Sequence, residues 1–118
     1  MDLRLKTKTV ELDGKQFSLC CNFNVLADIE ENHGGIVPLL RQPSMIDTVR
    51  IILSCMLNDY ADSMGWDCRY TPKDAGRVVF ADSTPLLVHA HELVDLVYSA
   101  IAGAPLVTEP SGEDASKN

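Results

Sequence analysis

The chain has 118 residues and a formal net charge of −7, and 46% of its residues are hydrophobic and 23% charged, which is typical of a soluble globular domain. An acidic chain lacks the basic surface that neutralises phosphates, so we expect no nucleic-acid partner. No apolar run reaches membrane-spanning length and no signal-peptide stretch opens the chain. We therefore expect no membrane partner and a cytoplasmic protein whose four cysteines are free thiols.

The chain starts with a predicted β-hairpin. Alternating apolar residues predict strands over Leu3–Leu12 and Lys15–Cys21, and the Asp13-Gly14 dipeptide between them is typical of a tight hairpin turn. Lys6 and Lys8 favour an exposed edge position for the first strand, because lysine discourages unwanted pairing there.

Helical spacing of apolar residues predicts three helices in the next part of the chain. Asn22 is suited to cap the first helix, and Gly34-Gly35 is suited to end it. Ser44 is suited to cap the third, whose wide apolar stripe indicates a central and mostly buried helix. The predicted ranges are Phe23–Asn32, Ile36–Leu40 and Met45–Tyr60.

The second half of the chain gives two clear start signals. Asp59–Tyr70 shows no readable period, and Thr71 followed by Pro72 then predicts a short helix that runs to about Phe80. Thr84 followed by Pro85 repeats the signal and predicts the final amphipathic helix, Pro85–Ala102.

These elements predict an α+β fold, mostly α, with an N-terminal β-hairpin followed by about four or five helices. We expect a single globular domain over residues 1–104, with the hairpin at 3–21 and the helical part at 22–103. The acidic C-terminal tail, residues 105–118, has too few apolar side chains to offset the entropy of ordering and is predicted to be disordered.

No motif in the chain predicts catalysis or metal binding. The cysteines and histidines form no C-x2-C pair, and His89 and His91 would point to opposite sides of a helix. We expect no catalytic residue, no metal and no cofactor, with Cys20, Cys55 and Cys68 as small buried residues and the histidines at the surface or its boundary. A small enzyme that uses Cys68 or His89 remains an alternative.

The order of these features resembles the tail assembly chaperones of long-tailed bacteriophages and related prophages, in their shorter, unshifted form. The resemblance covers most of residues 8–118. Its features are the Asp-Gly-Lys hairpin turn, the helix with an aromatic-Asn start and an acidic end, the glycine pair, the central apolar helix, the Thr-Pro-led short helix and the final amphipathic helix. These lie at Val10–Lys15, Phe23–Glu31, Gly34-Gly35, Met45–Tyr60, Thr71–Asp74 and Pro85–Ala102.

The resemblance implies a protein that is not an enzyme. Such a chaperone binds the tape measure protein, a long, apolar-rich helical chain, and keeps it soluble until tail tube subunits polymerise around it. The resemblance further implies self-association, action in the host cytoplasm and absence from the mature virion. The tail tube protein is a second expected partner through a longer frameshifted product, and the terminal Lys117-Asn118 is compatible with a slippery run of adenines.

Other functions remain open at the level of sequence. A different phage morphogenesis protein, for tail completion or head–tail connection, would be found in the mature virion. For the chaperone, the candidate partner-binding residues are apolar positions of the hairpin and of the last helix, each of which could equally belong to the core. They are Phe17, Leu19, Leu93, Val97 and Ile101.

Overall fold

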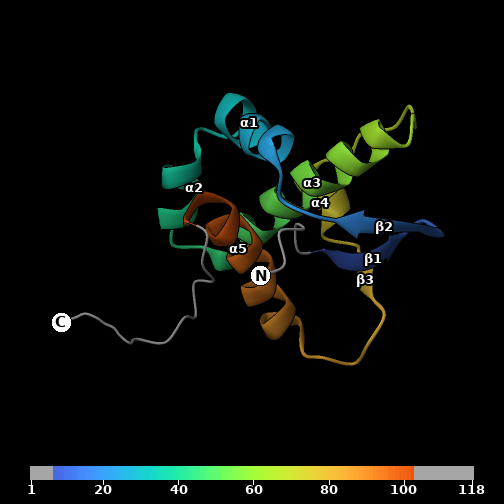
Figure 1. Cartoon of the computed structure of the whole chain (residues 1–118). Helices are drawn as coiled ribbons and strands as arrows, with labels where there is room; N and C mark the ends of the chain where they lie inside the picture. The colour runs from blue at the N-terminus through green and yellow to red at the C-terminus, as the bar shows by residue number, and fades with distance from the viewer. Residues whose placement is uncertain (1–6, 103–118) are drawn as a thin grey trace, which may run out of the picture.

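The structure, a computed structural model, describes residues 7–102 (Figure 1). Within that range the chain forms a three-stranded antiparallel sheet and five helices, so the predicted α+β, mostly helical fold is confirmed. The predicted tail, residues 105–118, and the start of the predicted first strand, residues 3–6, lie outside the described residues.

A hairpin of β1 (Lys8–Leu12) and β2 (Lys15–Leu19) opens the described chain. The turn residues Asp13 and Gly14 have φ angles of 53° and 75°. A two-residue hairpin turn needs positive φ at both of these positions to match the twist of the strands. The predicted turn is therefore confirmed; within the described residues the first strand begins at Lys8, and the second ends at Leu19, before the predicted Cys21.

A third strand corrects two predictions. β3 (Val79–Phe80) pairs with β1, so the strand order is β2-β1-β3 and β1 is the central strand, not an edge. The helix led by Thr71 does not reach Phe80, because α4 (Pro72–Ala75) is followed at once by its C-cap residue, Gly76. Valine and phenylalanine fit a pleated surface well, and the free edge of β1 supplies their backbone partners.

The predicted helices α1 (Phe23–Asn32) and α3 (Met45–Ser63) are confirmed together with their N-caps. Asn22 Oδ1 accepts a hydrogen bond from the Val25 N–H at 3.0 Å, and Ser44 Oγ accepts one from the Asp47 N–H at 3.2 Å. His33 is the C-cap of the first of these helices, and Gly34 and Gly35, with φ angles of 83° and 108°, then turn the chain into α2 (Ile36–Arg41) in conformations that favour glycine. The longer helices are α1 (Phe23–Asn32), α2 (Ile36–Arg41), α3 (Met45–Ser63) and α5 (Leu86–Ala102).

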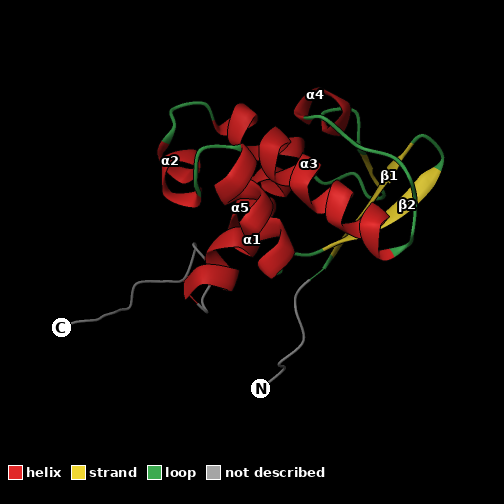
Figure 2. Ribbon diagram, turned by 90° about the horizontal axis from the view of Figure 1, so that it is seen from above, coloured by secondary structure: helices red, strands yellow, loops and turns green. Residues whose placement is uncertain are grey.

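The core is built around α3, which contacts α1, α4, α5 and β2. Figure 2 shows α3 running from the helical half of the molecule towards the sheet. At the sheet end, the Phe17 ring lies 5.5 Å from the rings of Trp66 and Tyr70 in edge-on geometry. This aromatic cluster gives the otherwise unreadable segment after α3 its place in the fold.

Candidate functional site

The structure places four of the five predicted partner-binding residues in the core. Phe17, Leu19, Leu93 and Val97 are each at most 1% exposed, so their side chains are not available to a partner of the folded protein. Ile101, near the end of α5, is 51% exposed and remains accessible. The amphipathic pattern identified the apolar face of each element. It did not show which part of that face is left uncovered by the rest of the fold.

Among residues 7–102, the longest run of consecutive exposed large apolar residues lies in the first turn of α5, which we call the α5 apolar turn, although Phe23 alone is more exposed at 88%. Leu86, Leu87 and Val88 are 73%, 61% and 44% exposed, and they are consecutive, so they cover most of the circumference of the helix. In Figure 1 this turn lies at the lower edge of the molecule, after the long loop that follows β3. Other large apolar residues are exposed over several elements: Phe23, Val37, Ile46, Met64, Val79 and Ile101.

A buried histidine fixes the base of the α5 apolar turn. His89 is only 2% exposed, so its predicted surface position is wrong. Its ring stacks on Phe80 of β3 with 3.9 Å between centroids, and its Nε2 lies 3.0 Å from Asp82 Oδ1. Lys8 of β1 also donates a hydrogen bond to Glu92 of α5. These contacts hold the helix start against the sheet while the leucines before it face outward.

The two side chains proposed for a small enzyme do not meet in one site. Cys68 Sγ lies 3.3 Å from the Tyr70 hydroxyl, whereas His89 contacts Phe80 and Asp82. Neither Cys68 nor His89 is among the residues that line the groove described next. Asp82 and Glu92 lie 3.0 Å and 3.4 Å from the two ring nitrogens of His89, whereas Cys68 lies beside Tyr70, so the two candidate side chains do not share a site.

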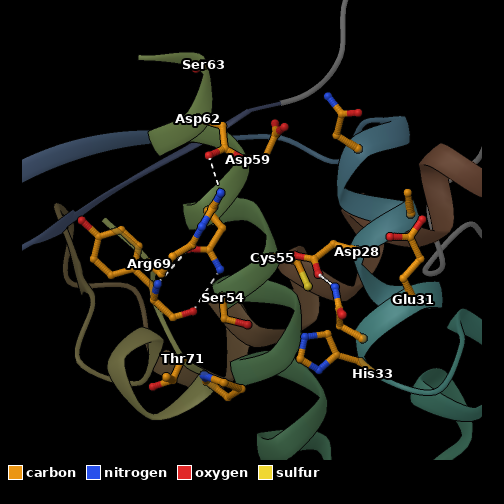
Figure 3. Close-up of a pocket in the computed structure, with 16 residues that line it drawn as sticks. Asp28, Glu31, His33, Ser54, Cys55, Asp59, Asp62, Ser63, Arg69 and Thr71 are labelled. Atoms are coloured by element: carbon orange, nitrogen blue, oxygen red, sulfur yellow. Dashed lines mark hydrogen bonds and ion pairs between the residues drawn. The ribbon is translucent and has the colours of Figure 1, made fainter. Parts of the chain in front are cut away.

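A polar groove of about 1000 Å³ lies along the contact between α1 and α3, and residues 69–72 line one end of it (Figure 3). Its lining includes four carboxylates, Asp28, Glu31, Asp59 and Asp62, against one guanidinium, Arg69. The resulting negative potential favours cations over anionic substrates.

Three side chains of different chemistry meet in this groove. One ligand atom each from Asp28, His33 and Cys55 lies within 4.8 Å of the other two. Burial, together with the neighbouring Asp28 carboxylate, raises the pKa of the Cys55 thiol to about 12. A thiol held protonated in this way is a poor nucleophile.

Cysteine and histidine spacing could not reveal this cluster. Asp28 and His33 are five residues apart at the end of α1, and Cys55 comes from the middle of α3. Only the packing of α1 against α3 brings the three together. A search of the sequence for metal ligands that included aspartate would still not have grouped these three residues, because their proximity depends on how α1 packs on α3.

No family model matches the chain, and the comparisons with curated proteins and with solved structures found no match. In the described part of the chain, no helix combines the length and the apolar character needed to cross a membrane. The α5 apolar turn and the α1–α3 groove are therefore the features from which function is inferred.

Proposed function

We propose that this protein is a tail assembly chaperone of the long-tailed bacteriophage type, which binds the tape measure protein stoichiometrically and does not act as an enzyme. The observation that supports this proposal is the α5 apolar turn. Three consecutive exposed apolar residues on a formed helix are costly in water and mark a contact surface. The fold has the hairpin, central helix and final helix that the resemblance implies.

The size of the α5 apolar turn suits weak, repeated binding. Full burial of one leucine contributes about 1.5–3 kcal/mol, and Leu86 and Leu87 are already partly covered. One such contact is weak by itself. Many copies along one long client, helped by self-association, gain affinity through multivalency.

Carboxylates beside the α5 apolar turn support the same function. Backbone and side-chain hydrogen bonds from Thr84 lower the pKa of Asp82, and the hydrogen bond from Lys8 lowers the pKa of Glu92. Both groups are therefore ionised at neutral pH. A charged rim keeps the free protein soluble while its apolar residues await a client.

The remaining elements of the proposal concern partners and location. The chaperone acts in the host cytoplasm and leaves before the virion matures. It recruits tail tube subunits through a longer frameshifted product. The region of that shift, Lys117-Asn118, lies outside the described residues, and its codons decide whether a slippery run is present.

Coexpression with a tape measure fragment from the same genome tests the proposal. The chain should keep the fragment soluble and purify with it, whereas a Leu86→Ser, Leu87→Ser double variant should bind at least about tenfold more weakly, since 1.4 kcal/mol corresponds to that factor. Val37→Ser, an exposed apolar position on α2, is the matched control. A soluble fragment that never binds the chain contradicts the proposal.

Purified virions separate this function from the tail-completion and connector alternatives. Quantitative mass spectrometry of mature particles should find none of this chain. Its presence in a fixed ratio to tail tube subunits would contradict the chaperone function and favour a structural component.

A further inference from the structure

The meeting of Asp28, His33 and Cys55 is independent of the α5 apolar turn. Asp28 lies within α1, His33 is the residue that ends α1, and Cys55 is a buried residue of α3. Their ligand atoms lie within 4.8 Å of one another. Figure 3 shows the three side chains directed towards a common space between the two helices.

We propose that Asp28, His33 and Cys55 bind one zinc ion, with water from the groove as the fourth ligand. Thiolate, imidazole and carboxylate are the protein ligands that zinc uses, and three of them with a water form a common tetrahedral set. Metal–ligand bonds of about 2.0–2.3 Å place such donor atoms about 3.4–3.6 Å apart. Side-chain rotations that draw the donors together by about 1 Å complete this geometry.

The surroundings of the three residues suit a cation. Asn32 Nδ2 donates a hydrogen bond to Asp28 Oδ1 at 2.7 Å, and partners of this kind orient a ligand carboxylate. Arg69, the guanidinium of the groove, is paired with Asp62 at 2.8 Å, which reduces its repulsion of an incoming ion. Calcium and magnesium prefer oxygen ligands alone, so a thiol and an imidazole select zinc-like metals.

The bound ion would join the end of α1 to the middle of α3. Zinc replaces the proton of the Cys55 thiol, which passes to solvent, and the thiolate then ligates the ion. Because the ligands are separated in the unfolded chain, the ion binds the folded state preferentially and stabilises it. This inference does not depend on the proposed chaperone function, because the three ligands belong to α1 and α3 and the proposed partner-binding surface belongs to α5.

Cobalt(II) is the probe for the test, because it takes zinc sites and gives a thiolate charge-transfer band in the near ultraviolet. The full-length metal-free chain should bind one Co²⁺ with this band, and excess Zn²⁺ should abolish the band. Cys55→Ser should lose the band, whereas Cys68→Ser should keep it. A band that is absent, that survives in Cys55→Ser or that disappears in Cys68→Ser overturns the proposal.

Zinc-dependent thermal stability of further variants tests the site even if Cys55→Ser does not fold. His33 is only partly buried, so His33→Gln should fold, as circular dichroism can verify, yet lose the rise in melting temperature that Zn²⁺ gives to the unaltered chain. His91→Gln, at an exposed position of α5, is the matched control and should keep that rise. Asn32→Ala should weaken zinc binding by roughly 10–100-fold. An equal rise in all variants, or none in the unaltered chain, contradicts the proposal.

Discussion

The two longest helices, α3 and α5, have similar apolar patterns and very different surroundings. α3 contacts α1, α4, α5 and β2, and Ile52 and Leu57 within it are fully buried. α5 packs chiefly on α3, so Leu93 and Val97 in its middle are buried while Leu86 and Ile101 near its ends are exposed. The same apolar periodicity thus supplies mostly buried core residues in α3 and leaves exposed apolar residues at the ends of α5, which we call the apolar surplus of α5.

This difference separates the apolar side chains that stabilise the fold from those that are free to contact a partner. Apart from Ile46 in its first turn, which is 56% exposed, the apolar stripe of α3 is largely covered inside one chain, so its side chains stabilise the fold. The apolar surplus of α5 contributes little to the folded monomer and is available to a partner. The comparison therefore predicts which substitutions unfold the protein and which alter only its interactions.

The largest expected effect comes from the centre of α3. Ile52→Ala should lower the free energy of unfolding by about 2–5 kcal/mol, because it removes fully buried methyl groups and leaves a cavity. Leu86→Ala on α5 should change it by less than about 0.5 kcal/mol. Urea titrations of both variants measure the difference. Equal losses would mean that the first turn of α5 is also part of the core.

A smaller loss is expected at the start of α1. Asn22 accepts the hydrogen bond that caps the helix, and its Nδ2 donates to Asp59 of α3 at 2.7 Å. Asn22→Ala should cost about 0.5–2 kcal/mol of unfolding free energy. Asn24→Ala, at an exposed position of the same helix, is the control and should cost less. A larger loss in the control would refute the capping role.

The smallest expected effect is a pH dependence at the base of α5. The hydrogen bond from Lys8 lowers the pKa of Glu92 in the folded state below its ordinary value of 4.5. Its contribution to stability is therefore present above pH 4.5 and is lost as the pH falls through the folded-state pKa. Between about pH 5 and pH 3, Glu92→Gln should lose less stability than the unaltered chain. Identical acid-unfolding curves for Glu92→Gln and the unaltered chain would contradict this role of Glu92.

Local signals were sufficient for most of the fold. The sequence correctly predicts the Asp13-Gly14 turn, the N-caps of α1 and α3 and the glycine pair that follows α1, because each depends on neighbours in sequence. β3 was missed because a two-residue strand has no period, and its formation depends on the distant edge of β1. The central position of β1 was missed for the same reason.

The candidate sites were less predictable, because both depend on which surfaces the fold brings together. The burial of Leu93 and the exposure of Leu86 follow from where α5 meets α3, which the helical period does not record. His89 looks like a surface residue in sequence, yet its ring stacks on Phe80 and is buried. Asp28, His33 and Cys55 became a cluster only through the packing of α1 on α3.

Amide hydrogen exchange on the full chain, with and without the tape measure fragment, would locate the surface that a partner covers. We expect added protection in the first two turns of α5 and little change in α3, whose core amides are already protected. Protection confined to the α1–α3 groove, or no change at the α5 apolar turn in a complex that forms, would contradict the claim that this turn is the partner-binding surface.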